Sequence, residues 1–149
     1  MVLLDTDIFV IDRFFQRDVR YPTNQALIDC LPRIDAGFSA FSLFELCGIA
    51  SFRMSPAELR RWSYNFDEVY GVKVLEPKGI DIMLAMSWFA RFSYRVLGIY
   101  ERKMTWEDAV LLLTAEDYGA EAILTWNKRH FEGRTVIKVL TPDEYLTTP

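Results

Sequence analysis

Short, wholly apolar runs alternate along this chain with longer segments whose apolar residues recur every three or four positions. Runs of the first kind are typical of strands covered on both faces, and they predict strands at residues 2–4, 38–41, 72–75, 122–125 and 136–140. Strands that alternate with helices favour a parallel sheet flanked by helices. The pattern therefore predicts an α/β fold, a three-layer α/β/α sandwich around a mainly parallel five-stranded sheet.

Polar residues with capping side chains precede each predicted helix. Ser55, followed by Pro56 and Glu58, is the strongest such signal, because Ser and Glu three residues apart can cap each other's backbone groups. Asp5, Thr23, Ser42 and Thr105 are the candidate caps of the other helices. Gly71 and Gly119 are predicted to end two helices, and Pro32 to make the end of the second helix irregular.

Two of these helices have apolar stripes that should face the core. In the helix that starts at Ser55 the stripe is Leu59, Trp62, Phe66 and Val69. A long helix over residues 80–97 is expected to point its own stripe inward and to end at Gly98, and that stripe is Ile82, Met86, Phe89, Phe92 and Val96.

Composition narrows the class of protein. The chain has 149 residues, of which 51% are hydrophobic and 15% aromatic, so residues 1–149 are expected to form one folded domain. A net charge of −4 argues against binding duplex DNA by bulk charge. The two cysteines are expected to be buried free thiols, and a lone histidine argues against a structural zinc site. Charges interrupt the most apolar stretch, so we expect no membrane span and a cytoplasmic location.

Three acidic residues lie where separate apolar runs begin or end. Asp5 follows the first strand, and Glu45 and Asp108 lie at the predicted starts of two helices. In parallel α/β sheets these positions share the edge at the carboxyl ends of the strands, where ligands bind. Each acid also has a structural interpretation as a helix-capping residue. Acids packed together repel one another, and a divalent cation is a common reason for them to stay ionised.

Several segments, in order, resemble the motifs of the PIN domain family. They are residues 5–8 (DTDI), 41–46 (FSLFEL), 106–109 (WEDA), 125–131 (TWNKRHF) and 139–146 (VLTPDEYL). The resemblance covers nearly the whole chain and extends to single-domain VapC-type toxins of toxin–antitoxin pairs. It implies a Mg²⁺- or Mn²⁺-dependent endoribonuclease that leaves a 5′-phosphate and a 3′-hydroxyl, with an antitoxin protein as a possible partner.

The resemblance also implies roles for individual residues. Asp5, Glu45 and Asp108 match the metal-binding acids, and Asn127 occupies the place where many members carry a fourth acid. Asp7 is a possible further metal ligand. Neighbours that would support these residues are Thr6, Ser42 and Thr125. Three acids and Asn127 favour one firm ion and a second that depends on RNA.

Cations and aromatic residues next to the acids are the candidates for RNA contact. Lys128 and Arg129 follow Asn127 directly, and Trp126 could stack on an unpaired base. His130 is expected to be structural. Asn127 in place of an acid leaves a second interpretation open, a catalytically inactive PIN fold that acts as a binding module. Dense apolar content favours a homodimer through the helices at residues 55–70 and 80–97.

Overall fold

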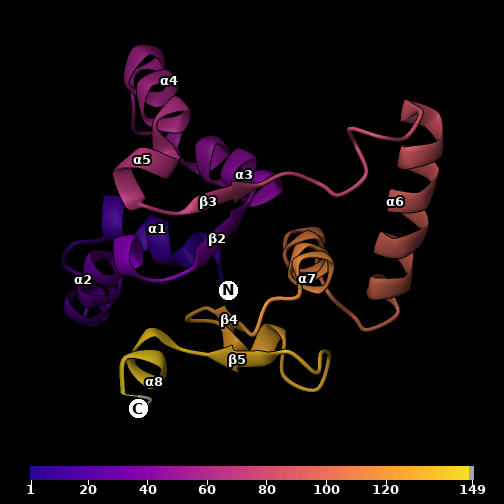
Figure 1. Ribbon diagram of the computed structural model, residues 1–149. Helices are drawn as coiled ribbons and strands as arrows, with labels where there is room; N and C mark the ends of the chain where they lie inside the picture. Colours follow the sequence, from indigo (N-terminus) through magenta and orange to yellow (C-terminus); the bar gives the residue numbers. More distant parts are fainter. Residues whose placement is uncertain (148–149) are drawn as a thin grey trace.

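A five-stranded parallel sheet forms the centre of the protein (Figure 1). The computed structural model describes residues 1–147. The strand order is β3-β2-β1-β4-β5, and every neighbouring pair is parallel. The strands are β1 (Val2–Leu4), β2 (Ala36–Ser39), β3 (Lys73–Leu75), β4 (Ala122–Leu124) and β5 (Lys138–Leu140). The predicted fold class is confirmed, with each of the four later strands one or two residues shorter or displaced relative to its apolar run.

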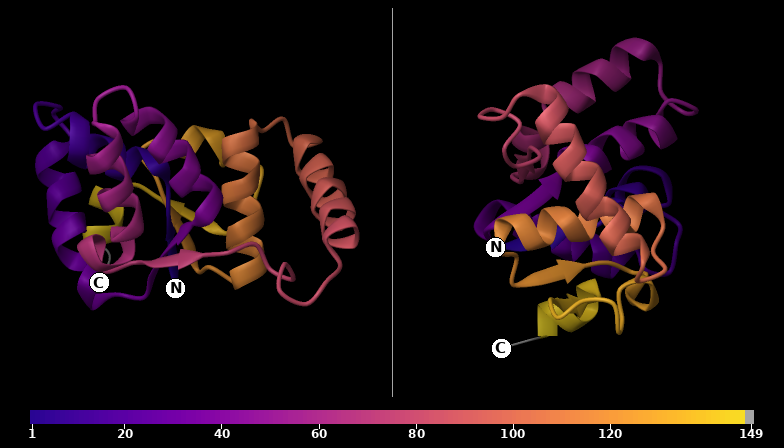
Figure 2. Two further views of the ribbon diagram at one scale, coloured as in Figure 1. Left: turned by 90° about the horizontal axis from the view of Figure 1, so that it is seen from above. Right: turned by 90° about the vertical axis from the view of Figure 1, so that its right-hand side faces the viewer.

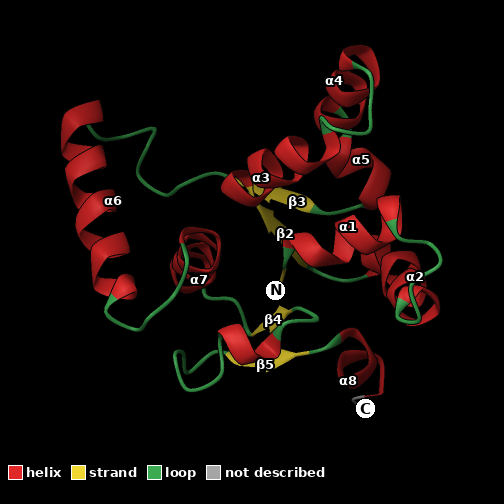
Figure 3. Ribbon diagram, turned by 180° about the vertical axis from the view of Figure 1, so that it is seen from behind, coloured by secondary structure: helices red, strands yellow, loops and turns green. Residues whose placement is uncertain are grey.

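Helices cover both faces of the sheet, and the views of Figures 2 and 3 show α6 as the outermost element, beyond α7. The α-helices are α1 (Thr6–Phe14), α2 (Tyr21–Cys30), α3 (Ala40–Ala50), α4 (Pro56–Tyr64), α5 (Phe66–Tyr70), α6 (Ala85–Tyr100), α7 (Trp106–Tyr118) and α8 (Pro142–Thr147). Two single turns of 3-10 helix are η1 (Leu31–Arg33) and η2 (Lys128–His130). Pro32 lies in η1, as its predicted irregular turn requires.

Strand β1 separates two hydrophobic cores. Val2 and Leu4 point into the core formed with α1 to α5, whereas Leu3 points into the core formed with α6 and α7. This division follows from the strand geometry, in which successive side chains point to opposite faces. Both faces of β1 are fully covered, which explains why its sequence is apolar without alternation.

The start of α3 differs from the sequence-based prediction. The helix begins at Ala40 and not after Ser42, and strand β2 accordingly ends at Ser39. The Ser39 hydroxyl does not cap the helix, because it lies 3.0 Å from the Thr114 hydroxyl of α7. Ser42 is therefore a buried residue inside the helix, 3% exposed, and its predicted capping role is wrong. Glu45 consequently lies in the second turn of α3.

The long helix α6 also differs from its prediction, in both position and orientation. It begins at Ala85 and continues through Gly98 to Tyr100, and Lys103 with φ 60° follows it. Only two members of the predicted inward stripe, Phe92 and Val96, pack against the core. The others are exposed, and they are Ile82 (83%), Met86 (80%) and Phe89 (59%).

Three further helix predictions have different outcomes. The capping box at Ser55 is confirmed, with the Ser55 hydroxyl accepting from the Glu58 N–H and the Glu58 carboxylate accepting from the Ser55 N–H. A break at Asn65 separates α4 from α5, so Tyr70 is buried in place of Val69. Thr23 is no cap, because α2 begins at Tyr21 after a turn held by Asp18.

The structure also bears on two predictions made from composition, the burial of the cysteines and the expectation of no membrane span. Cys30 and Cys47 are free, but both are half-buried and not fully buried. Across residues 1–147, every helix is too short or too polar to cross a lipid bilayer.

Candidate active site

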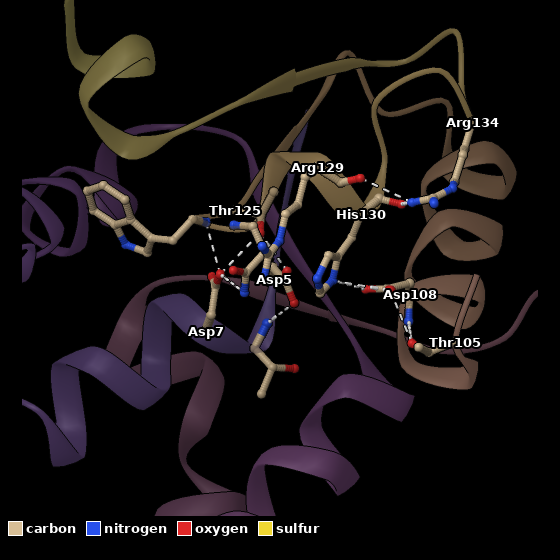
Figure 4. Close-up of polar contacts among 11 residues, drawn as sticks. Asp5, Asp7, Thr105, Asp108, Thr125, Arg129, His130 and Arg134 are labelled. Atoms are coloured by element: carbon tan, nitrogen blue, oxygen red, sulfur yellow. Dashed lines mark hydrogen bonds and ion pairs between the residues drawn. The ribbon is translucent and has the colours of Figure 1, made fainter. Parts of the chain in front are cut away.

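The carboxyl edge of the sheet gathers most of the predicted polar residues (Figure 4). Asp5 follows β1 directly, and the loop with Thr125 and Asn127 follows β4. Glu45 reaches the same region from α3, and Asp108 from the first turn of α7. Parallel pairing of β1 with β4 fixes this juxtaposition, and the Asp5 N–H donates to the Leu124 carbonyl at 3.0 Å.

Asp5 is held on both sides. Its Oδ1 accepts from the Thr6 N–H at 2.7 Å, so it caps α1, and its Oδ2 accepts from the Thr125 hydroxyl at 2.7 Å. Burial raises the pKa of Asp5 to about 6, although both hydrogen bonds favour the ionised form. The structural and the metal-binding interpretations of Asp5 are therefore compatible, since capping uses one carboxylate oxygen only.

Asp7 points into the loop after β4. Its Oδ2 accepts from the Trp126 N–H at 2.9 Å, from the Asn127 amide at 3.2 Å and from the Thr125 hydroxyl at 3.1 Å. Its Oδ1 is buried and has no hydrogen-bond partner among the described residues. Burial and the charge of Asp5 raise the pKa of Asp7 well above its ordinary value.

Glu45 is joined to the first helix by Thr6. The Thr6 hydroxyl donates to the Glu45 carboxylate at 2.7 Å, and the Thr6 side chain is almost completely buried. Burial raises the pKa of Glu45, and the charges of Asp5, Glu107 and Asp108 raise it further. Thr6 thus supports two acids at once, with its N–H bonded to Asp5 and its hydroxyl to Glu45.

Asp108 has two partners of its own. The Thr105 hydroxyl donates to Asp108 Oδ2 at 3.0 Å, and Thr105 caps α7 by accepting from the Asp108 N–H. The ring Nδ1 of His130 lies 3.3 Å from Asp108 Oδ2. Figure 4 shows His130 pointing from the loop after β4 toward Asp108. The lone histidine is therefore at the site, where it contacts one of the acids.

The acids share an electrostatic environment, but they do not converge on one point. The charge of Asp108 contributes to the raised pKa of Asp5, and the charges of Asp5 and Asp108 both contribute at Glu45. Within residues 1–147, however, no three Asp, Glu, His or Cys side chains are placed closely enough to hold a metal ion as they stand. An oxygen-only donor set with an unpartnered Asp7 Oδ1 suits Mg²⁺ or Mn²⁺ in its chemistry.

The predicted RNA-contacting residues have mixed surroundings. Lys128 donates to the Glu144 carboxylate at 2.8 Å, and Arg129 is exposed. The Trp126 indole N–H donates to Asn24 at 2.9 Å, and the guanidinium of Arg20 lies 5.8 Å from the centre of its ring. Lys128 and Trp126 thus bond to other residues of the protein. Arg129, the second cation of this group, is exposed.

Asn24 is a supporting residue that was not predicted from the sequence. It is fully buried, and its amide donates to the Ile8 carbonyl of α1 at 2.9 Å while its oxygen accepts from Trp126. It therefore ties α1, which carries Asp7, to the loop after β4. The sequence did contain a signal for a buried Asn24. Asn24 lies three positions before Leu27 and four before Ile28, so it is a polar residue on the apolar stripe of this helix.

The fold defines the structural class of this protein. The chain has the PIN-like α/β/α fold, and the comparisons with known proteins agree. No family model matches the sequence, and no curated protein matches it either. Solved structures do match, and the three described below are each 17% identical in sequence, so the likeness is one of fold.

Three solved structures illustrate this likeness. A toxin–antitoxin complex from Klebsiella pneumoniae matches with a TM-score of 0.61 over 95% of this chain and 98% of that one. FitAB bound to an IR36 DNA fragment matches with a TM-score of 0.57 over 95% of each chain. The Mycobacterium tuberculosis toxin VapC20, which cleaves the sarcin–ricin loop, matches with a TM-score of 0.53 over 83% of this chain and 87% of that one. The predicted PIN-like fold is confirmed.

Proposed function

We propose that this protein is a divalent-metal-dependent endoribonuclease and the toxin of a toxin–antitoxin pair. One observation carries the proposal. Asp5, Glu45 and Asp108 come from three separate parts of the fold and lie at the carboxyl edge of one parallel sheet, where Thr6 is hydrogen-bonded to both Asp5 and Glu45. Burial, and then the charges of the neighbouring acids, raise the pKa of Glu45 there. The fold shared with VapC20 and with a toxin–antitoxin complex supports the same function.

The acids are the groups that would hold the metal. Asp5, Glu45 and Asp108 are the proposed ligands, with Asp7 as a possible addition, and their side chains would have to draw together from their present positions. When bound, Mg²⁺ or Mn²⁺ neutralises charge on the attacked phosphate and lowers the pKa of water. Like-charged carboxylates in a half-buried edge gain most from such an ion, because each repels its neighbours.

The remaining residues would orient the acids. Thr6 fixes Asp5 and Glu45 relative to each other, and Thr125 fixes Asp5 against the loop after β4. Asn127 is neutral and already donates to Asp7 at 3.2 Å, so it supplies an amide where a fourth acid would add charge. This arrangement favours one firmly held ion over two.

The decisive experiment compares the wild type with Asp5→Asn. The wild type should cleave single-stranded RNA with Mg²⁺ or Mn²⁺ and stop when EDTA is added. Asp5→Asn should lose cleavage while keeping its circular dichroism spectrum, because Asn retains the cap but not the charge. Mn²⁺ should also raise the melting temperature of the wild type and leave that of the variant unchanged. Equal cleavage by both proteins, purified free of other nucleases, would refute the proposal.

A binding module without catalysis is the second candidate function. Two observations favour it, the Asn at position 127 and the separation of the acids among the described residues. Calorimetry distinguishes the two functions. Heat of Mn²⁺ binding at millimolar metal, lost in Asp5→Asn, supports the nuclease, whereas no binding together with no cleavage supports the module.

We further propose two protein partners, an antitoxin and a second copy of this chain. The antitoxin rests on the fold shared with the Klebsiella pneumoniae toxin–antitoxin complex. Co-expression with the product of an adjacent reading frame, followed by co-purification, tests it. The second copy rests on the exposed apolar face of α6, which Met86, Phe89 and Leu97 form.

A further inference from the structure

Four aromatic rings from three helices form a continuous row beside the acidic edge. We call them the aromatic row, and they are Trp88 and Phe92 of α6, Phe41 of α3 and Trp106 of α7. Trp88 stacks on Phe92 at 5.1 Å between ring centres, and Phe92 lies 5.2 Å from Phe41. Trp106 meets both Phe41 and Phe92 edge-on at 6.0 Å.

One end of the aromatic row lies next to the candidate metal ligands. Phe41 precedes Glu45 by four residues in α3, so the two side chains lie on the same face one turn apart. Trp106, the first residue of α7, meets Phe41 edge-on at 6.0 Å, and Asp108 lies in the same first turn of α7. The row therefore runs from α6 to the edge where the acids gather.

Trp106 is the member of the row that is most open to solvent. It is 43% exposed, while its edge-on contacts with two other rings fix its orientation. The cavity beneath the row, lined by Phe41, Trp88 and Leu113 among others, has a volume of about 20 Å³. Such a cavity holds a single water molecule, so a larger ligand must meet the rings from outside.

Two arginines of α6 lie beside the Trp88–Phe92 end of the aromatic row. Arg91 is exposed on α6, directly before Phe92, and lines the cavity. Arg95 lies one turn further on and is held by Asp117 at 2.6 Å. Aromatic faces next to cations are the usual means by which proteins hold single-stranded nucleic acid, because every base has a face for stacking and every nucleotide a charged phosphate.

We propose that Trp106 is the stacking platform for an unpaired base next to the cleaved phosphate. The ligand class is single-stranded RNA. This inference rests on the proposed nuclease function, which it deepens by assigning a base subsite. Duplex RNA is a poor ligand here, because its bases present no free face to an aromatic ring.

Binding without cleavage tests the subsite. A fluorescently labelled oligoadenylate is titrated with protein in EDTA, so that it is not hydrolysed. Trp106→Leu keeps an apolar side chain but removes the aromatic face, and it should weaken binding by roughly 5- to 140-fold, the range that corresponds to one stacked base. Trp106→Phe should restore most of the affinity but lose part of the quenching of tryptophan fluorescence by RNA.

Phe52→Leu is the matched control. Phe52 is 90% exposed at the turn after α3, away from the N-terminal turn that carries Phe41, so its replacement should leave affinity within twofold. If Trp106→Leu unfolds, the loss of quenching in Trp106→Phe still decides the question.

The outcomes separate the subsite from the nuclease function. Wild-type affinity and KM in Trp106→Leu, in a protein that still cleaves RNA, would overturn the subsite and leave the nuclease proposal standing; the aromatic row would then serve only to join α6 to α3 and α7. A wild type that neither binds nor cleaves RNA would refute the nuclease proposal, and the subsite with it.

Discussion

The Thr125 hydroxyl has one proton and faces two carboxylates. It lies 2.7 Å from Asp5 and 3.1 Å from Asp7, and it accepts from the Asn127 N–H at 2.9 Å. It can donate to only one of the two acids at a time. The second acid is then less well stabilised as an anion, so the shared hydroxyl offsets only part of the rise that burial causes in the pKa values of Asp5 and Asp7.

Ionised Asp5 should lower the stability of the protein at neutral pH. Its folded pKa of about 6 lies above the unfolded value near ~3.9, so the folded state binds more protons between these values. The contribution of Asp5 to stability should therefore fall as pH rises from about 4 to about 6, and the full loss remains above that range.

Asp5→Asn should remove this loss. In EDTA at pH 7.5 we expect the variant to be more stable than the wild type by roughly 2–3 kcal/mol, from about 1.4 kcal/mol for each unit of pKa. The gain should disappear near pH 4, where Asp5 is largely protonated in the folded state and the unfolded state binds protons too. Urea unfolding at the two pH values measures both effects. A variant less stable than the wild type at pH 7.5 would contradict the raised pKa.

Asp18→Asn provides a control of opposite sign. The side chain of Arg20 holds the pKa of Asp18 at about 2, through bonds of 2.9 and 2.8 Å. Because folding lowers the pKa of Asp18, its ionised side chain stabilises the folded state at pH values above the pKa it has in the unfolded state. Asp18→Asn should therefore make the protein less stable at pH 7.5.

The sequence predicted which sheet edge most of the candidate site residues would share. Asp5, Glu45, Asp108 and Asn127 reach the edge because the order of parallel strands and capped helices is visible in the pattern of apolar and polar residues. Their hydrogen bonds were not visible, since Thr125 is joined to Asp5 across 120 positions of the chain. The aromatic row was missed for the same reason, because its rings come from three helices whose packing the sequence does not specify.

At the scale of elements, it was hardest to predict which face of a helix is buried. Apolar residues occur all around α6, and the buried ones are Val96 and Ile99, with Trp88 and Phe92 half-buried one turn apart. A periodic stripe can be drawn through Ile82, Met86 and Phe89 as well. The choice between the two stripes depends on the contact with α7, which is a tertiary feature. The start of α3 was likewise decided by a contact with α7, at Thr114.

Replacing glycine by alanine should change the stability of the protein in opposite directions at two positions. Gly98 lies inside α6, and a Cβ atom placed there would meet nothing within 4 Å, so Gly98→Ala should stabilise the protein by about 0.5–1 kcal/mol. Gly71 has φ +65° and its Cβ would lie 2.8 Å from the Pro32 Cα, so Gly71→Ala should destabilise by at least about 1–2 kcal/mol. Thermal and urea unfolding of both variants measures these changes. Stabilisation by both substitutions would contradict the backbone conformation at Gly71.

For the molecule as a whole, the exposed area leaves room for the proposed dimer. The chain exposes 8641 Å², whereas a compact monomer of its mass is expected to expose about 7,900 Å². The excess, roughly 800 Å², is similar in size to the area that one partner buries in a standard interface. Its most apolar part lies on α6, the outermost helix, where Met86 and Phe89 are one turn apart.

Phe89→Asp should therefore give a monomer. Light scattering at micromolar concentration should show twice the chain mass for the wild type and the chain mass for the variant, because a charge in the centre of an apolar interface is costly to desolvate. Phe52→Asp, at a more exposed position in the turn after α3, should stay dimeric. A monomeric wild type would remove the basis for the second copy as a partner.

The pairing of β1 with β4 has a consequence for the order in which the protein becomes complete. The Thr125 hydroxyl that holds Asp5 is synthesised 120 residues after Asp5 itself. Strand β1 cannot acquire its neighbour β4, nor Asp5 its support, until that length of chain and β4 with it have left the ribosome. The proposed nuclease would therefore lack a complete site during most of its own translation, and the ribosome that makes it would not meet a finished active site on the nascent chain.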